Sequence, residues 1–237
     1  MTNNKQLIIF IKEPIAGQCK TRLIPLLGEQ GAADFYKQLA SHSVTTSKQL
    51  SNIDIALYTY PDTQHPFVQN LVLETSASIQ CQQGDDLGER MYNALSTSLK
   101  KYSHSVLIGS DCPAISCNYI EQAFKALDSH DITLGPATDG GYVLIGCTKI
   151  SPSVFANTQW SSSTVLQQCL SNINQLNYSQ HLLDELWDVD TPNDFLQNQL
   201  AIDRILNQQF TTAVTLIIGL SYLAIRISYL IANFIGF

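Results

Sequence analysis

The chain alternates short, continuously apolar blocks with longer segments whose apolar residues recur every three or four positions. Residues 7–11 read Leu-Ile-Ile-Phe-Ile, which is the pattern of a strand covered on both faces. Residues 29–50 instead carry Ala33, Tyr36 and Leu39 at helical spacing. We therefore expect strands and helices to take turns along the sequence.

The same periodicity predicts the remaining elements. Further strands are expected at 53–60, 78–82, 105–109, 132–134, 142–145 and 186–189. Helices are expected at 86–101, 116–128 and 161–176, and from Pro192 onward, since proline suits a first helical turn. Asp86 and Glu89 resemble a capping box at one of these helix starts. Strands alternating with helices predict an α/β domain with a mostly parallel sheet and helices on both faces, spanning residues 1–205.

Composition narrows the class of protein. The 237 residues suit one large domain, and the net charge of -7 argues against a nucleic-acid binder. The six cysteines form no CxxC pair, which is typical of a reduced, cytoplasmic protein. Basic residues nevertheless gather near the start, at Lys5, Lys12, Lys20 and Arg22. This cluster indicates either a local anion site or a solvated loop.

The loop that follows the first predicted strand is a candidate phosphate site. Backbone N–H groups around Gly17, together with Lys20 and Arg22, could bind a diphosphate or triphosphate, and Lys12 and Thr21 lie in the same loop. The loop has neither the spacing of a Walker loop nor a GxGxxG fingerprint. A proline and glycine turn with solvated bases is the alternative.

Aspartates follow two of the later predicted strands. Asp111 comes directly after 105–109, where a carboxylate can hold Mg²⁺ or Mn²⁺ against donor phosphates. Asp188 and Asp190 alternate along a strand, so both side chains could face the same side. The structural alternatives are that Asp111 forms an Asx turn and that Asp190 or Thr191 caps the following helix.

Two further segments follow predicted strands. Asp139 and Gly140 are typical of a hairpin turn, and the pair Gly140-Gly141 before Tyr142 also allows a ligand to approach the backbone. The predicted helix start accounts for much of the segment 82–90, which includes Gly84 and Asp86. Its position after a strand also favours a contact with the nucleotide or the acceptor.

Taken in order, these segments resemble bacterial transferases of the nucleotide-diphospho-sugar superfamily, which have the GT-A fold. The group most similar is the glycosyltransferase-like family related to 2-phospholactate guanylyltransferase, also described as radical-SAM/selenodomain-associated transferases. The resemblance covers about residues 5–200 and implies a Rossmann-like, three-layer α/β/α domain with a mostly parallel mixed sheet. It rests on Lys12–Leu23, Gly84–Arg90, Gly109–Pro113, Gly135–Tyr142, Trp160 and Asp188–Asp194.

The resemblance also implies roles for residues. It assigns donor phosphates to Gly17, Lys20 and Arg22, a divalent cation to Asp111 and Asp190, and the acceptor to Asp139. These roles lead us to expect that Lys20, Arg22 and Asp111 are catalytic. Lys12, Gly17, Thr21, Gly84 and Asp86 are expected to complete the nucleotide and phosphate site, and Gly140, Gly141 and Tyr142 the acceptor side.

The expected activity is metal-dependent transfer from a nucleotide phosphate donor. Glycosyl transfer from a nucleotide sugar is the first hypothesis. Because the Asp-x-Asp motif of glycosyltransferases is reduced here to Ser110-Asp111-Cys112, nucleotidyl transfer from a nucleoside triphosphate to a phosphorylated acceptor, with release of pyrophosphate, stays open. A non-catalytic nucleotide-binding module is the third alternative. The acceptor itself is not identified by the sequence.

Residues 206–237 depart from this pattern. Residues 211–237 form an apolar stretch long enough to cross a bilayer, interrupted by Arg226. Small and polar residues in this stretch fall on one narrow stripe of a helix. Three interpretations stay open: a membrane segment whose stripe meets a partner helix, a helix buried in a dimer, or a tail outside the ancestral fold. The first is favoured and would attach a cytoplasmic enzyme to the inner face of the membrane.

Overall fold

The computed structural model describes residues 4–206. Contacts divide the chain into two units, Met1–Gln199 and Leu200–Phe237, and the α/β fold lies in the first. The apolar stretch expected at 211–237 lies outside the described residues. Within the part that is described, no helix combines the length and apolar character needed to cross a membrane.

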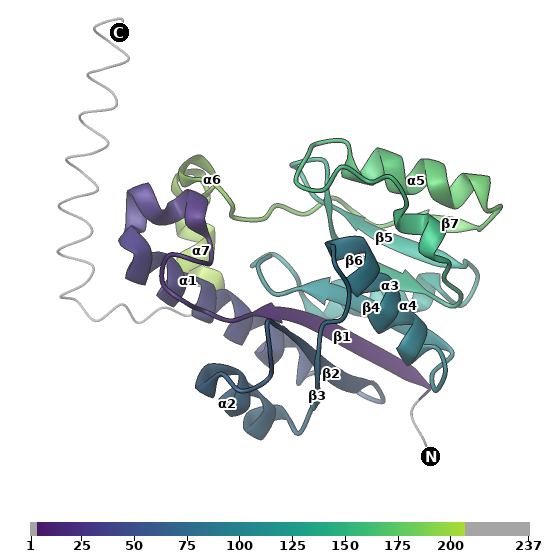
Figure 1. The fold of residues 1–237 in the computed structure, drawn as a ribbon, viewed down its shortest axis with the longest axis horizontal. Coiled ribbons are helices and arrows are strands. Elements are labelled where there is room, and N and C mark those ends of the chain that lie inside the picture. Colours follow the sequence, from purple (N-terminus) through teal and green to yellow (C-terminus); the bar gives the residue numbers. More distant parts are fainter. Residues whose placement is uncertain (1–3, 207–237) are drawn as a thin grey trace, which may run out of the picture. The chain divides into compact units, whose positions relative to one another are not determined.

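The first unit contains one seven-stranded sheet (Figure 1). Its strands lie in the order β3-β2-β1-β4-β6-β5-β7. All neighbouring pairs are parallel except those that involve β6, which runs antiparallel between β4 and β5. The strand bounds are β1 Lys5–Lys12, β2 Asp54–Tyr60, β3 Ser78–Cys81, β4 His104–Gly109, β5 Ile132–Pro136, β6 Tyr142–Cys147 and β7 Gln180–Leu182.

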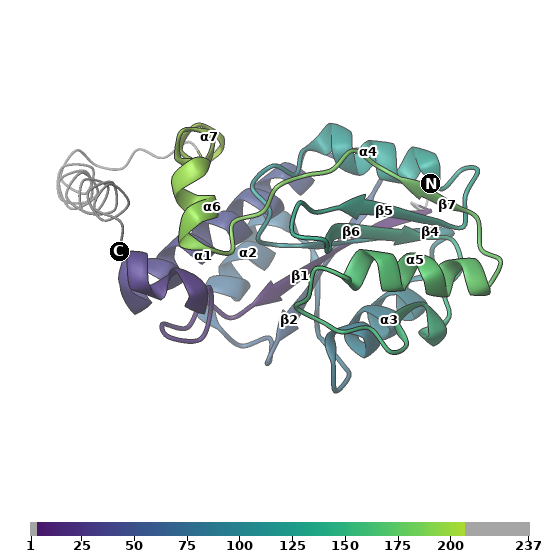
Figure 2. The ribbon, with the colours of Figure 1, turned by 90° about the horizontal axis from the view of Figure 1, so that it is seen from above.

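Helices cover both faces of this sheet, so the predicted three-layer fold is confirmed (Figure 2). On one face Leu7, Ile9 and Ile11 of β1 belong to a core with α1, α2 and α4. On the other face Ile8 and Phe10 belong to a core with α3 and α5. The helix bounds are η1 Thr21–Leu23, α1 Ile24–Ser47, α2 Pro66–Thr75, α3 Leu87–Ser98, α4 Cys117–Ala126, η2 Pro152–Phe155, α5 Val165–Gln175, α6 Pro192–Gln197 and α7 Gln199–Ile205.

Helix starts follow their local chemistry. At the start of α3 the Asp86 carboxylate accepts the backbone N–H of Glu89. The Glu89 carboxylate accepts the backbone N–H of Asp85 and not that of Asp86. Only half of the predicted capping box therefore forms. At α6 the box is complete: Thr191 accepts from Asp194, whose carboxylate accepts the N–H of Thr191. Thr191 is thus the N-cap, one of the two residues that the sequence indicated for this role.

Four elements differ from the sequence-based prediction. The strand expected at 186–189 is wrong, since Leu186 makes only an isolated bridge to Ala137 and the backbone then continues as a loop. The structure adds α2 and the edge strand β7, neither of which the sequence predicted. In addition, α1 begins before residue 29 because the helix continues across a kink at Gly28.

The predicted hairpin between β5 and β6 is confirmed, with the turn at 137–141. Because β6 is antiparallel, its first residue Tyr142 lies at the same edge of the sheet as the last residues of β1, β2 and β4. This edge therefore gathers the loops after three parallel strands and the turn of the hairpin. In open α/β sheets it is the edge where ligands bind.

Candidate active site

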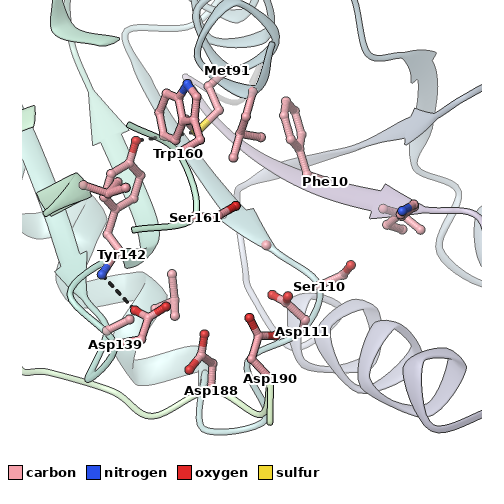
Figure 3. Close-up of a pocket in the computed structure, with 18 of the residues that line it drawn as sticks. Phe10, Met91, Ser110, Asp111, Asp139, Tyr142, Trp160, Ser161, Asp188 and Asp190 are labelled. Carbon is pink, nitrogen blue, oxygen red and sulfur yellow. Dashed lines mark hydrogen bonds between the residues drawn. The ribbon is translucent and has the colours of Figure 1, made fainter. Parts of the chain in front are cut away.

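A pocket of about 610 Å³ lies at this edge (Figure 3). It is lined by residues from the ends of β1, β2 and β4, the start of β6, the first turn of α3 and the segment before α6. Carboxylates gather on one side of it, at Asp111, Asp139, Asp188 and Asp190. Asp111 and Asp139 are among the residues that the sequence singled out because they follow predicted strands.

Lys20 is the centre of the charged side. Its side chain is only 6% exposed, and its Nζ donates to Asp190 Oδ1 at 2.7 Å and to Asp111 Oδ2 at 3.2 Å. The backbone of Lys20 adopts a left-handed conformation with φ of 46° immediately before the short helix η1. A non-glycine residue in that region costs about 1–2 kcal/mol, so the surrounding contacts hold it in place.

Arg22 adds a second positive charge at the mouth of the pocket. Its Nη1 lies 3.6 Å from Asp190 Oδ2, but the side chain is 60% exposed. A guanidinium with most of its donors in contact with solvent can still bind an incoming anion in a bidentate manner. The loop after β1 thus supplies one buried and one accessible cation.

The pKa values in this cluster follow from burial and from the opposite charges. Burial alone would lower the pKa of Lys20, but Asp111 and Asp190 raise it well above its ordinary value, so the ammonium stays charged. Burial would raise the pKa of Asp190, and the nearby Lys20 and Arg22 more than reverse this, so that it is lowered. The Lys20–Asp190 pair is therefore an ion pair at neutral pH.

Asp188 behaves differently from its neighbour Asp190. Burial raises its pKa to about 7, with further contributions from the negative charges of Asp139, Asp190 and Asp111. Asp188 and Asp190 both line the pocket, as predicted from their alternation. Of the four carboxylates in this cluster, Asp111 and Asp190 are paired with Lys20, and Asp190 also with Arg22.

The donor atoms in this cluster suit a hard cation, since they are carboxylate oxygens. The Lys20 ammonium already stands between Asp111 and Asp190, so this part of the pocket holds one positive charge between two carboxylates. Among the described residues, no three His, Cys, Asp or Glu side chains form a ready-made metal-binding group. The oxygen donors are of the type that a divalent cation prefers, and the Lys20 ammonium lies between Asp111 and Asp190 in this structure.

A buried hydrogen-bond chain supports the floor of the site. The Tyr36 hydroxyl, from α1, accepts the backbone N–H of Lys12 at 2.8 Å and lies 2.7 Å from Ser110 Oγ. Burial raises the pKa of Tyr36 to about 12, so the phenol stays protonated. This hydroxyl ties the end of β1 to the residue that precedes Asp111.

The hairpin turn forms another wall. The Asp139 carboxylate accepts the N–H of Gly141 at 2.8 Å, and the Gly140 carbonyl accepts the N–H of Leu166 at the start of α5. Asp139, Gly141 and Tyr142 line the pocket, whereas Gly140 does not. Gly140 instead packs against the backbone of Ser163.

The predicted nucleotide residues are divided by the structure. Lys12 and Thr21 line the pocket, and the Lys12 ammonium donates to the carbonyl of Gln18. Gly17, Gly84 and Asp86 are not among the lining residues, and Asp86 caps α3. The lining also includes Phe10, Tyr36, Tyr60 and Met91, which lie outside the segments that the sequence singled out. Gln82, Arg90, Ser110 and Trp160, which lie inside those segments, line the pocket as well. A helical pattern placed Tyr36 on a buried side, but nothing in the sequence connects it with Ser110.

The mixed, mostly parallel sheet with helices on both faces gives this chain a nucleotide-diphospho-sugar transferase-like α/β fold. A family model described as "Uncharacterized protein conserved in bacteria (DUF2064)" matches residues 43–162, and the chain belongs to this family. No curated protein matches the chain.

Solved structures share the fold. A protein of Desulfovibrio desulfuricans G20, provisionally described as a nucleotide-diphospho-sugar transferase, is 26% identical with a TM-score of 0.74, over 86% of this chain and 98% of that chain. The 4-diphosphocytidyl-2C-methyl-D-erythritol synthase of Anaerococcus prevotii DSM 20548 is 8% identical with a TM-score of 0.55, over 84% and 99%. The inositol-1-phosphate CTP transferase of T. maritima is 11% identical with a TM-score of 0.55, over 88% and 99%. At these identities the last two show a common fold.

Proposed function

We propose that this chain is a metal-dependent transferase that uses a nucleotide phosphate donor, and that it transfers a glycosyl group from a nucleotide-diphospho-sugar. The observation that carries the proposal is the cluster of Lys20, Arg22, Asp111 and Asp190 at the carboxyl edge of the sheet. The similarity to the Desulfovibrio desulfuricans protein, whose description is a nucleotide-diphospho-sugar transferase, supports the choice of donor.

In this proposal the loop after β1 binds the donor phosphates. The exposed Arg22 guanidinium makes the first contact with the diphosphate, and the Lys20 ammonium neutralises charge that develops on the leaving nucleoside diphosphate. Lys12, at the pocket wall, adds to the positive field. Catalysis of this kind requires positioning and charge stabilisation rather than a covalent intermediate.

Asp111 and Asp190 would hold Mg²⁺ or Mn²⁺. When bound, the cation would neutralise phosphate oxygens of the donor and favour departure of the leaving group. The protein's own part is to hold the two carboxylates at one place, which Tyr36 supports through Ser110, next to Asp111. Asp139 and Tyr142, on the hairpin side, would face the acceptor.

Nucleotidyl transfer to a phosphorylated acceptor is a second candidate. Asp111 stands alone where many glycosyltransferases have Asp-x-Asp, and its counterpart Asp190 comes from a segment far along the chain. Two separate carboxylates around one cation position would equally serve attack on the phosphate of a nucleoside triphosphate. A non-catalytic nucleotide-binding module is the third candidate.

Calorimetric titration and product analysis distinguish these candidates. The full chain is titrated with nucleotide sugars and nucleoside triphosphates, with and without Mg²⁺ or Mn²⁺, and bound donors are then followed for products. Release of nucleoside diphosphate supports glycosyl transfer, whereas release of pyrophosphate supports nucleotidyl transfer. Binding that needs no metal and gives no product supports a binding module.

The Asp111→Asn variant should lose the metal-dependent part of binding and all turnover, while Asp34→Asn, whose exposed carboxylate lies on α1, should lose neither. Wild-type rates in Asp111→Asn would contradict the proposal.

A further inference from the structure

The pocket has a second half, which differs in chemistry from the charged side. In Figure 3 the carboxylates lie at one end, while Trp160, Met91 and Phe10 lie at the other. None of the side chains in this second part carries a charge. We call it the apolar half and define it by Phe10, Leu87, Met91, Tyr142, Trp160 and Val165.

Trp160 forms the outer wall of the apolar half. It lies in the loop between η2 and α5, with its ring centroid 6.4 Å from that of Phe155. A Cβ atom at Gly88 would stand 2.7 Å from Trp160 Cζ2 and 2.8 Å from Phe155 Cβ. Glycine at this position therefore lets the indole lie directly against the first turn of α3.

Few polar groups face this half. The Tyr142 hydroxyl donates to Met91 Sδ at 3.8 Å, and Ser162 Oγ donates to the carbonyl of Gln159 at 2.7 Å. The remaining hydroxyl close to Trp160 in the lining is that of Ser161 (Figure 3). A ligand with many hydroxyl groups would leave most of them without hydrogen-bond partners after losing water, which costs about 1–3 kcal/mol for each group. Apolar ligand surface, in contrast, gains about 25 cal/mol per Å² when it is buried.

The strand order indicates which substrate each side of the pocket can bind. Lys20 and Asp111 follow the adjacent strands β1 and β4 at the centre of the sheet. On the β2 and β3 side of this centre, the Arg90 guanidinium lies 3.9 Å over the Tyr60 ring, and Gln82 lines the wall. On the β6 side lie Tyr142 and Trp160. A donor whose phosphates lie at the centre can thus place its nucleoside toward β2 and β3, which leaves the β6 side for the second substrate.

We propose that the apolar half binds the acceptor, and that the group bound there is an uncharged apolar ring rather than a phosphorylated or polyhydroxylated one. This inference rests on the proposed function, because it takes the charged side as the place of the donor. It adds the substrate class of the acceptor, for which the charged cluster gives no information.

Fluorescence of Trp160 tests the proposal directly. The chain has two tryptophans, so a Trp187→Phe variant leaves Trp160 as the only one. The probes are cyclohexanol and inositol, which share a six-carbon ring and differ in the number of hydroxyl groups. Cyclohexanol should shift the emission of Trp160 to shorter wavelength in a saturable manner, and inositol and glucose 6-phosphate should not. A saturable response to inositol or glucose 6-phosphate, without one to cyclohexanol, would overturn the proposal.

A pair of leucine variants provides the control. Leu87 lines the apolar half and is 44% exposed, while Leu73 on α2 is 81% exposed and lies outside the pocket lining. Leu87→Ser should weaken cyclohexanol binding about fivefold, and Leu73→Ser should leave it unchanged. Saturation-transfer NMR on the unlabelled chain gives the same comparison without the Trp187→Phe substitution. Equal binding by both variants would contradict the assignment.

Nucleotides separate this inference from the proposed function. If a nucleotide sugar with Mn²⁺ competes with cyclohexanol and shifts Trp160 emission by itself, the nucleobase occupies the apolar half and the acceptor assignment is wrong, while the proposed function stands. If calorimetry detects no nucleotide binding, the proposed function fails, and the cyclohexanol and inositol titrations still decide which ligand class the apolar half binds.

Discussion

The Lys20 ammonium lies 2.7 Å from Asp190, a residue 170 positions further along the chain. The same ammonium also contacts Asp111, so one buried side chain joins the first, middle and last parts of the fold. The loop after β1 is thereby fixed to the segment before α6. Its strained backbone at Lys20 is maintained by these two contacts.

Replacing Lys20 should affect stability as well as binding. Lys20→Met leaves Asp111 and Asp190 without their buried counter-ion, and hydrogen bonds to charged groups contribute about 1.5–3 kcal/mol. Because both carboxylates are partly exposed, we expect the free energy of unfolding to fall by about 2 kcal/mol at pH 7. Urea denaturation measures this. Lys37→Met, which removes an ion pair on the surface of α1, should cost less than about 0.5 kcal/mol. Equal losses in the two variants would contradict the role of Lys20.

Asp188 should make stability depend on pH. Its pKa of about 7 in the folded chain lies above the value of about 3.9 expected when unfolded, so the folded state holds more protons between these limits. Its contribution therefore falls as pH rises from about 4 to 7. Asp188→Asn removes this dependence, and the melting temperature of the variant minus that of the wild type should be more positive at pH 8 than at pH 5. The measurement uses chelator-treated protein, and the exposed Glu185→Gln should show no such change. An identical difference at both pH values would refute the assignment.

Two glycines with positive φ should respond differently to alanine. Gly28 has φ of 71° and ψ of 168°, a region nearly restricted to glycine, with open space around its missing Cβ, so Gly28→Ala should cost only the backbone strain of about 2 kcal/mol. Gly140 has φ of 88°, and the carbonyl of Ser163 occupies the place of a Cβ. Gly140→Ala should therefore cost about 3 kcal/mol, from strain and overpacking together. Urea denaturation of the two variants measures which of them loses more free energy of unfolding. A larger loss for Gly28→Ala would contradict the prediction, because the turn around Gly140 would then accept a Cβ atom by rearranging.

The hydroxyl pair of Tyr36 and Ser110 should be energetically coupled. Tyr36→Phe removes the acceptor of the Lys12 N–H and the partner of Ser110, with an expected loss of about 1–2 kcal/mol. Ser110→Ala should lose about 1 kcal/mol. The double variant should lose less than the sum, because the two substitutions remove one shared hydrogen bond. A double-mutant cycle by urea denaturation measures the coupling, and strict additivity would contradict it.

How far the sequence predicts the fold depends on burial. The central strands carry continuous apolar runs because helices cover both of their faces, so β1 and β4 could be predicted. The edge strand β7 has exposed His181 and Leu182 and offers no such run. In α2 only Val68 and Leu71 are buried, which is too few for a periodic signal.

The candidate site shows the same limit. Lys20, Asp111 and Asp190 could be proposed because each lies where the chain leaves the sheet region, next to a strand or a helix start. That Lys20 stands between the two carboxylates depends on the path of the loop after β1, which no local pattern specifies. The closeness of Asp188 to Asp139 likewise arises from the hairpin of β5 and β6 lying beside the segment before α6. These are tertiary relationships between residues far apart in sequence.

The reversed direction of β6 has a consequence for how such a protein can change. It brings the hairpin turn to the edge where the parallel strands end. In the charged cluster Lys20, Arg22 and Asp111 lie in the loops after β1 and β4. In the apolar half Tyr142, Trp160 and Val165 come instead from residues 142–165. Insertions or substitutions in the loop at 156–164 could therefore reshape the apolar half without touching the charged cluster. Related chains could in this way diverge in the second substrate while they conserve the first.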